Sequence, residues 1–234
     1  MKENVVLNQD PIEIVYEQTR FELLSRLREE AWEIQKRVRA PTFVYGSLAR
    51  GDVHPKSDID IIILEPVDPL LIEYELGVGE GAPVEREIVQ ATPNHVVKGH
   101  IHINHYTTLT FPLLPLNPVE EEFYRYSGLC SNGEGDRNRR VPGVNKKLLL
   151  IAPTERGHIE SSIMDRTKEL SKLLDVRLDI IQERIRVLTK RTKYGRTGVF
   201  LQEPLQPHET FGSRLQYLAD RNNIVRRQIK LRGG

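Results

Sequence analysis

The sequence predicts an α+β protein in which a mixed sheet with flanking helices precedes a mostly helical region. Short β-branched runs alternate with helical patterns over residues 1–152, and helical patterns dominate residues 153–234. The charge changes as well, because residues 1–150 contain 17 Lys and Arg against 23 Asp and Glu, whereas residues 151–234 contain 17 against 10. These observations predict two domains, residues 1–152 and residues 153–234.

The composition narrows the class of protein. At 234 residues, with 29% charged and 38% hydrophobic residues, the chain can bury a sizeable core. No apolar run approaches the roughly 18 residues of a membrane span, so we expect no membrane contact. Met1–Asn4 lacks the basic and apolar parts of a signal peptide, and a single cysteine, Cys130, excludes an intrachain disulfide. We therefore expect a cytoplasmic protein.

The first predicted element is one long helix over residues 10–39. Asp10 is a good N-cap, Pro11 suits the first helical position, and Pro41 ends the helix. The later elements of the first domain are a strand at 42–45, a short helix within 46–50, a strand at 58–64, a helix at 68–76, a strand at 84–91, a hairpin of 99–105 and 107–111, and a strand at 146–152.

Two aspartates mark the strand predicted at residues 58–64. Asp58 and Asp60 are one residue apart, so a strand points both side chains the same way while its isoleucines point into the core. Neighbouring carboxylates repel each other unless a cation lies between them, and magnesium prefers carboxylate oxygens. Gly46-Ser47 ends the preceding strand in a turn suited to phosphate. This stretch predicts a phosphate-binding turn followed directly by a metal-binding strand end.

Taken together, Gly46-Ser47, Arg50-Gly51 and Ser57-Asp58-Ile59-Asp60 resemble the signature of the DNA polymerase beta type nucleotidyltransferases. The resemblance implies a nucleotidyltransferase-type sheet, a nucleoside triphosphate (NTP) substrate, and magnesium, with manganese as the alternative ion, held by the two aspartates. It also implies that the turn and its neighbours bind the nucleotide. The candidates for nucleotide binding are Gly46, Ser47, Arg50, Lys56 and Ser57.

Members of this superfamily often carry a third carboxylate on a later strand. Glu87 is the candidate for a third catalytic and metal-binding acid, and Glu85 is a second acid on the same face of its strand. The alternative is that both glutamates face solvent.

Two histidines stand out in the predicted hairpin, where His100 and His102 share one face with Asn104. A His-x-His pair on a strand can bind zinc. The sequence shows no third strong ligand beside the pair, and histidines on the solvated face of a sheet are the commoner case.

Residues 153–234 predict helices at 163–174, 177–192 and 209–221, a strand at 199–201 and a basic tail at 226–232. A helix pair followed by a glycine-containing β element resembles a winged helix-turn-helix, whose second helix would enter the major groove of DNA. The predicted nucleic-acid contacts are Arg177, Arg184, Lys190, Arg191, Lys193 and Arg196.

We therefore expect a metal-dependent nucleotidyltransferase that moves a nucleoside monophosphate from an NTP to a hydroxyl acceptor linked to nucleic acid. The alternative is a nucleic-acid-binding transcriptional regulator whose nucleotidyltransferase fold only binds nucleotide.

Overall fold

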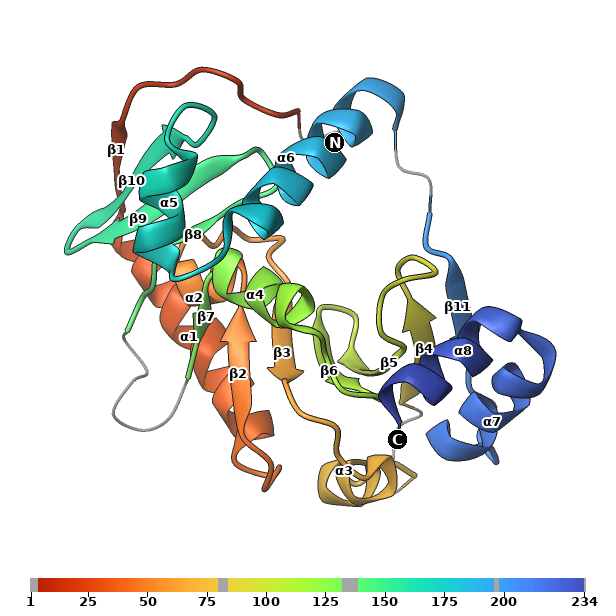
Figure 1. Ribbon diagram of the computed structural model, residues 1–234. Coiled ribbons are helices and arrows are strands. Elements are labelled where there is room, and N and C mark those ends of the chain that lie inside the picture. The colour runs from red at the N-terminus through yellow and green to blue at the C-terminus, as the bar shows by residue number, and fades with distance from the viewer. Residues whose placement is uncertain (1–3, 80–83, 132–138, 196–197, 234) are drawn as a thin grey trace.

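A seven-stranded mixed sheet forms the centre of the molecule (Figure 1). The computed structural model describes residues 4–79, 84–131, 139–195 and 198–233. The strand order is β11-β4-β5-β6-β3-β2-β7; β3 and β6 are parallel, and the other neighbouring pairs are antiparallel. The strands are β2 (Thr42–Tyr45), β3 (Ile59–Ile63), β4 (Glu85–Gln90), β5 (Lys98–Asn104), β6 (Thr107–Pro112), β7 (Leu129–Cys130) and β11 (Leu201–Pro204).

A smaller antiparallel sheet of order β1-β10-β9-β8 lies beside it. Its strands are β1 (Ile12–Val15), β8 (Gly143–Val144), β9 (Leu149–Thr154) and β10 (Gly157–Ser162). The helices are α1 (Gln18–Gln35), α2 (Ser47–Arg50), α3 (Pro69–Leu76), α4 (Pro118–Tyr126), α5 (Thr167–Leu174), α6 (Leu178–Tyr194), α7 (Phe211–Arg221) and α8 (Asn223–Arg232). In the described residues, no helix combines the length and the apolar character that crossing a membrane requires.

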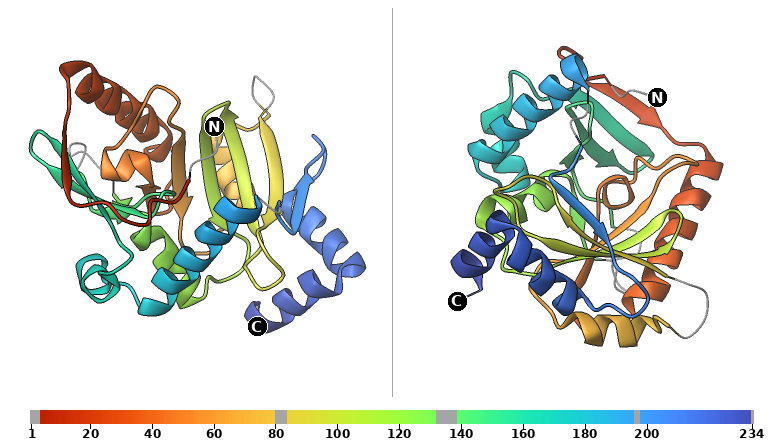
Figure 2. Two further views of the ribbon diagram at one scale, coloured as in Figure 1. Left: turned by 90° about the horizontal axis from the view of Figure 1, so that it is seen from above. Right: turned by 90° about the vertical axis from the view of Figure 1, so that its right-hand side faces the viewer.

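Helix α1 covers one face of the central sheet. Its apolar side, from Leu24 to Ile34, shares one core with Ile59 and Ile61 of β3. Because side chains alternate along a strand, Asp60 points to the opposite face. Figure 2 shows α1 and α4 on opposite sides of β2 and β3, so α4 borders the face that carries Asp60.

The helix predicted at residues 10–39 is wrong at its start. Residues 12–15 form β1, which pairs with β10, and α1 begins only at Gln18. The sequence Ile12-Glu13-Ile14-Val15 alternates as a strand does, and a pairing partner about 145 residues away along the chain decides in favour of the strand. The helix predicted at 163–174 likewise begins later, at Thr167, because residues 163–166 form a turn that follows β10.

The strand predicted as a wing belongs to the central sheet instead. β11 pairs antiparallel with β4, from Leu201 opposite Gln90 to Pro204 opposite Glu87. The helix pair itself is present as α5 and α6, but its apolar side packs into a core shared with Tyr126 of α4. The boundary predicted after residue 152 falls within β9.

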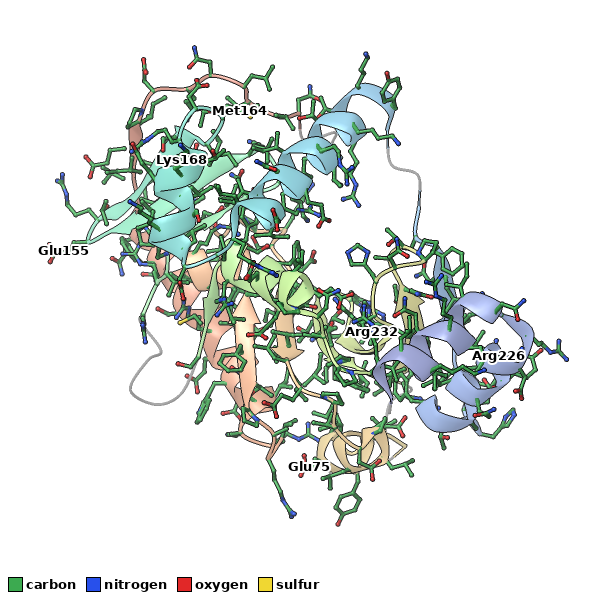
Figure 3. All side chains as sticks on the ribbon, viewed as in Figure 1. Glu75, Glu155, Met164, Lys168, Arg226 and Arg232 are labelled. Atoms are coloured by element: carbon green, nitrogen blue, oxygen red, sulfur yellow. The ribbon has the colours of Figure 1, made fainter. Side chains whose placement is uncertain are left out.

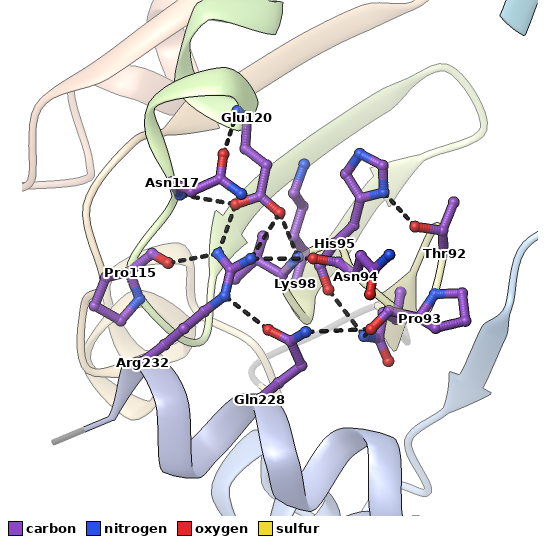
Figure 4. Close-up of polar contacts among 12 residues, drawn as sticks. Thr92, Pro93, Asn94, His95, Lys98, Pro115, Asn117, Glu120, Gln228 and Arg232 are labelled. Atoms are coloured by element: carbon purple, nitrogen blue, oxygen red, sulfur yellow. Dashed lines mark hydrogen bonds and ion pairs between the residues drawn. The ribbon is translucent and has the colours of Figure 1, made fainter. Parts of the chain in front are cut away.

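The predicted basic tail is a helix that docks on the rest of the molecule. In α8, Arg232 Nη1 lies 2.6 Å from Glu120 Oε2 of α4, and the same carboxylate accepts a hydrogen bond of 2.6 Å from the Val96 amide (Figure 4). The Gln228 side chain donates to the Pro93 carbonyl at 3.2 Å. Figure 3 shows Arg232 where the end of α8 meets the central sheet. At least this arginine therefore stabilises the fold and is not free to contact phosphate.

Candidate active site

The Gly46-Ser47 turn joins β2 to the short helix α2. Gly46 has φ 75° and ψ −142°, a conformation that essentially only glycine adopts. Nothing lies within 4 Å of the position that a Cβ atom would take, so the turn borders open space. The Gly46 amide donates to the Gly128 carbonyl at 3.0 Å. A phosphate at this turn must therefore be held by the groups that follow Gly46.

Arg28 of α1 holds α2 in position. Its buried guanidinium donates to the carbonyl of Leu48 at 2.8 Å and to that of Ala49 at 3.2 Å. The last carbonyls of a helix have no partner within the helix, so the arginine supplies the donors that a further turn would have provided. This contact fixes the turn against the helix that precedes it in the sequence.

The aspartate pair lies beside this turn. β2 and β3 are antiparallel with Val44 opposite Ile61, so the end of β2 meets the start of β3. Continued by one residue, this register sets Tyr45 opposite Asp60. Asp58 is exposed and Asp60 is partly buried. The structure thus brings together the two features that the sequence predicts as one site, the glycine turn and the two carboxylates.

Asp60 is the more strongly perturbed of the two acids. Burial, and to a lesser degree the charge of Asp58, raise the pKa of its carboxyl from 3.8 to about 6, against the opposing effect of Lys146. The negative charges of the two carboxylates repel each other, and a divalent cation bound between them would relieve this repulsion.

Two residues beyond the candidates named above for catalysis and nucleotide binding also lie at the site. Tyr45 packs edge-to-face on Tyr124 of α4, with ring centroids 5.0 Å apart, and burial followed by the charge of Asp60 raises the pKa of its hydroxyl well above 10. Lys146, in the turn between β8 and β9, is close enough to lower the pKa of Asp60. Counting the antiparallel register across the turn would have found Tyr45, whereas Lys146 comes from a distant segment.

The remaining candidates for nucleotide binding take different roles. Arg50 is buried, pairs with Asp52 at 3.0 Å and donates to the Ser127 carbonyl at 2.6 Å, so its guanidinium serves the fold. The buried Ser57 hydroxyl accepts a hydrogen bond of 2.9 Å from the His54 amide and shapes the turn before Asp58. Lys56 is exposed in the same turn. Of these three, Lys56 is the one whose side chain is free to approach a phosphate.

Glu87 lies too far from the aspartates to share an ion with them. Its strand, β4, is separated from β3 by β5 and β6. Three strand spacings amount to about 14 Å, whereas the ligands of one magnesium ion lie within about 4 Å of each other. Glu85 is on the same strand and is equally remote. In the part of the chain that the structure describes, no third Asp, Glu, His or Cys forms a compact group with Asp58 and Asp60.

Glu87 instead contacts the two histidines of β5. Its Oε1 atom lies 3.0 Å from His102 Nε2 and 3.7 Å from His100 Nδ1. The Gln202 side chain of β11 donates to its other oxygen at 2.8 Å. The contact with His100, opposed by burial and reinforced by Gln202 and His102, lowers the pKa of the Glu87 carboxyl to about 2. The sequence identified all three side chains but assigned the glutamate to the other site.

The predicted nucleic-acid contacts divide into two groups. Arg177 is exposed but pairs with Glu122 at 2.9 Å, and Arg184 lies over the Phe123 ring, where burial lowers its pKa. By contrast, Lys190, Arg191 and Lys193 are exposed along the last turns of α6. Arg196 lies outside the described residues. The exposed cations therefore form a short patch on α6, which we call the α6 patch and define as these three exposed residues.

One family model matches the part of the chain that contains the glycine turn and the two aspartates. Residues 24–111 match the family model of the nucleotidyltransferase domain. The match runs from α1 through β6 and so contains the glycine turn, both aspartates and the parallel neighbour of β3. It supports nucleotidyl transfer as the general activity and does not extend to β11 or to helices α5 to α8. Neither the curated proteins nor the solved structures contain a match to this chain.

Proposed function

We propose that this protein is a magnesium-dependent nucleotidyltransferase that transfers a nucleoside monophosphate from an NTP to a hydroxyl group linked to nucleic acid. The observation that carries the proposal is the juxtaposition of Asp58 and Asp60 with an open glycine turn at one end of the sheet. The family match over residues 24–111 supports the same activity.

The donor set suits magnesium. Asp58 and Asp60 supply hard oxygen ligands, and the raised pKa of Asp60 indicates a carboxylate whose charge lacks sufficient compensation from the protein. Two carboxylates are enough, since magnesium is commonly bound by one or two carboxylates together with substrate phosphates and water. When bound, magnesium or manganese would supply a Lewis acid that lowers the pKa of the attacking hydroxyl and neutralises charge on the triphosphate.

The chain's own groups bind and orient the substrate. Gly46 keeps the turn open so that phosphates approach the backbone and Ser47. Lys56 and Lys146 are exposed cations on the loops that flank the aspartates, which suits them to the charge of a triphosphate and of departing pyrophosphate. In-line displacement at a phosphoryl group depends mainly on positioning and electrostatics, so this arrangement needs no protein nucleophile.

The α6 patch supports an acceptor that is a nucleic acid. Three exposed cations within one helix turn attract a phosphate backbone, and the basic composition of residues 151–234 adds to that attraction. The second candidate function is a nucleotide-binding regulator without transfer activity. It is favoured by one observation, namely that no third acid accompanies the aspartates among the described residues.

Transfer of label from each of the four α-labelled NTPs separates these two functions. RNA, DNA, protein and free hydroxyl compounds serve as acceptors, in magnesium and again in manganese. We expect label on a nucleic acid with the wild type and none with the Asp58→Ala/Asp60→Ala variant. If the wild type binds nucleic acid and NTP but transfers label to none of the acceptors, the regulator is the correct assignment.

A further inference from the structure

The polar face of the central sheet carries a second group of side chains, separate from the aspartates. Glu87 on β4 and His100 on the neighbouring β5 are directly opposite each other, and His102 follows two residues later on the same face. Their three ligand atoms all lie within 4.8 Å of one another. This group, which we call the β4–β5 cluster, is two to three strands away from Asp60.

The spacing of the cluster fits a small metal ion. Zinc binds imidazole nitrogen and carboxylate oxygen at about 2.0–2.2 Å, which sets tetrahedral ligands about 3.4 Å apart. The two distances from Glu87 Oε1, 3.0 Å to His102 Nε2 and 3.7 Å to His100 Nδ1, lie on either side of that value. Since all three ligand atoms lie within 4.8 Å of one another, side-chain rotations can bring them to the spacing that an ion requires.

The cluster also has the outer contacts that orient metal ligands. The second nitrogen of His102, Nδ1, is hydrogen-bonded to the Thr108 hydroxyl at 3.0 Å, which directs Nε2 toward Glu87. The second oxygen of Glu87 accepts from Gln202 at 2.8 Å. Metal-binding histidines and carboxylates are usually held in this way by a partner on the far atom. The side chain of Gln202 reaches Glu87 only because β11 joins the sheet beside β4.

We propose that Glu87, His100 and His102 bind one zinc ion or a chemically similar transition-metal dication. Imidazole nitrogens favour zinc over magnesium, so this site and the aspartate pair select different metals. Two histidines and one glutamate are the ligand set of zinc sites that keep a fourth position for water or substrate. All three side chains are partly exposed, which leaves that position accessible from the polar face.

The test measures zinc binding by the full-length protein after treatment with a chelator. We expect one zinc ion per chain by elemental analysis and by calorimetric titration, unaffected by millimolar magnesium. The Asp58→Ala/Asp60→Ala variant should bind zinc as the wild type does. Substituted cobalt should give the visible absorption of a low-coordinate nitrogen and oxygen site, a readout that does not depend on transfer activity.

Variants of the cluster show which residues hold the ion. Loss of a residue that only orients a metal ligand lowers metal affinity by roughly 10- to 100-fold, and we expect a loss of roughly 10-fold for Gln202→Ala. Loss of a ligand itself should lower zinc affinity by more than that range, as in His100→Ala, His102→Ala and Glu87→Gln. His105→Ala is the matched control, because His105 is exposed on the same hairpin. Circular dichroism of the metal-free variants checks folding, and the cobalt spectrum of the wild type decides the matter if a variant does not fold. A wild type that binds no zinc, or cluster variants that bind it equally well, would reduce the cluster to a hydrogen-bonded ion pair and overturn the proposal.

Discussion

At the scale of single residues, folding raises the pKa of the Asp60 carboxyl, whereas the proposed metal binding requires its ionised form. Its carboxylate is partly buried beside Asp58, and its pKa rises to about 6. An acid with a raised folded-state pKa binds its proton more tightly when folded, so stability falls as pH rises from about 4 to 6. Above pH 6 the metal-free protein bears the full cost of the charge, and a bound cation would remove it.

The first prediction concerns this cost. Asp60→Asn should stabilise the metal-free protein by about 2 kcal/mol at pH 8, because a shift of about two pKa units is worth about 2–3 kcal/mol. The gain should shrink through pH 6 and vanish near pH 4, where the wild type is protonated. Thermal unfolding across this pH range measures it, with the exposed Asp165→Asn as control. An equal difference in stability between variant and wild type at pH 4 and pH 8 would contradict the raised pKa of Asp60.

The same variant, Asp60→Asn, should lose transfer activity by at least about 1,000-fold, since several kcal/mol of charge stabilisation depend on the carboxylate.

A second prediction concerns Gly46. Gly46→Ala places a side chain in a conformation that only glycine adopts readily, which should cost about 1–3 kcal/mol of stability and weaken NTP binding. Gly79→Ala is the matched control, since Gly79 has φ 94° and also has nothing within 4 Å of its Cβ position. Both variants should lose stability, and only Gly46→Ala should weaken binding of an NTP analogue in calorimetry. Equal binding by the two variants would remove the turn from the site.

At the scale of elements, two strand pairings determine which side chains lie next to each other on the polar face of the sheet. The parallel pairing of β3 with β6 sets Asp60 opposite Thr108, and the antiparallel hairpin then sets Thr108 opposite His102. Directly opposite residues share a face, so this row runs from the aspartates to the β4–β5 cluster. Each position follows from register and not from closeness in sequence.

The third prediction tests the α6 patch. If nucleic acid binds there, Lys190→Ala/Arg191→Ala/Lys193→Ala should reduce the dependence of log affinity on log salt by about 2–3, because each phosphate contact contributes about 0.7–0.9 to that slope. Arg26→Ala on α1 is the control, since its side chain is also exposed. The measurement is a filter-binding or anisotropy titration at several salt concentrations. An unchanged slope would mean that the nucleic acid binds another surface.

At the scale of the whole molecule, the C-terminal part is integrated into the sheet rather than attached beside it. β11 extends the central sheet, and Arg86 of β4 donates to carbonyls of Gln206 and Glu209 at 3.0 Å each. At the end of the chain, Arg232 pairs with the almost fully buried Glu120. The residues from β11 to α8 therefore belong to the same structural unit as the central sheet.

The fourth prediction tests this integration. Arg232→Ala leaves the buried Glu120 carboxylate without its cation, and loss of one partner of a buried ion pair costs about 3–5 kcal/mol. Arg227→Ala, exposed on the same helix, should change stability by less than about 0.5 kcal/mol. Chemical denaturation measures both. Equal midpoints for the two variants would show that α8 is not stabilised by this contact.

The sequence predicts the local features of this molecule better than the distant ones. The strand at 42–45, the helix 68–76 capped by Asp68, and the aspartate pair follow from nearby residues, and the structure contains each element with small shifts in its bounds. Residues 12–15, predicted as helix, form β1, whereas the strand predicted at 199–201 is present as β11 but pairs within the central sheet; both are short runs whose partner strands lie far away along the chain. Local propensity cannot decide such runs, because the pairing partner determines their state.

In the candidate site too, the residues that are close in sequence were predicted correctly as neighbours, whereas the distant Glu87 was not. Gly46, Asp58 and Asp60 meet because one short antiparallel connection joins them, so their spacing in sequence was sufficient. Glu87 was assigned to them by family resemblance, whereas the sheet order separates it by two intervening strands. The same strand order sets Glu87 beside His100 and His102, for which the sequence shows no third metal ligand.

The most direct test of the central claim is a crystal structure of the protein with magnesium and an NTP analogue that resists transfer. We predict metal density at both Asp58 and Asp60, with the triphosphate extending to the Gly46-Ser47 turn and close to Lys56 or Lys146. A triphosphate bound away from the two aspartates, or bound beside them with no metal at their carboxylates, would contradict the account.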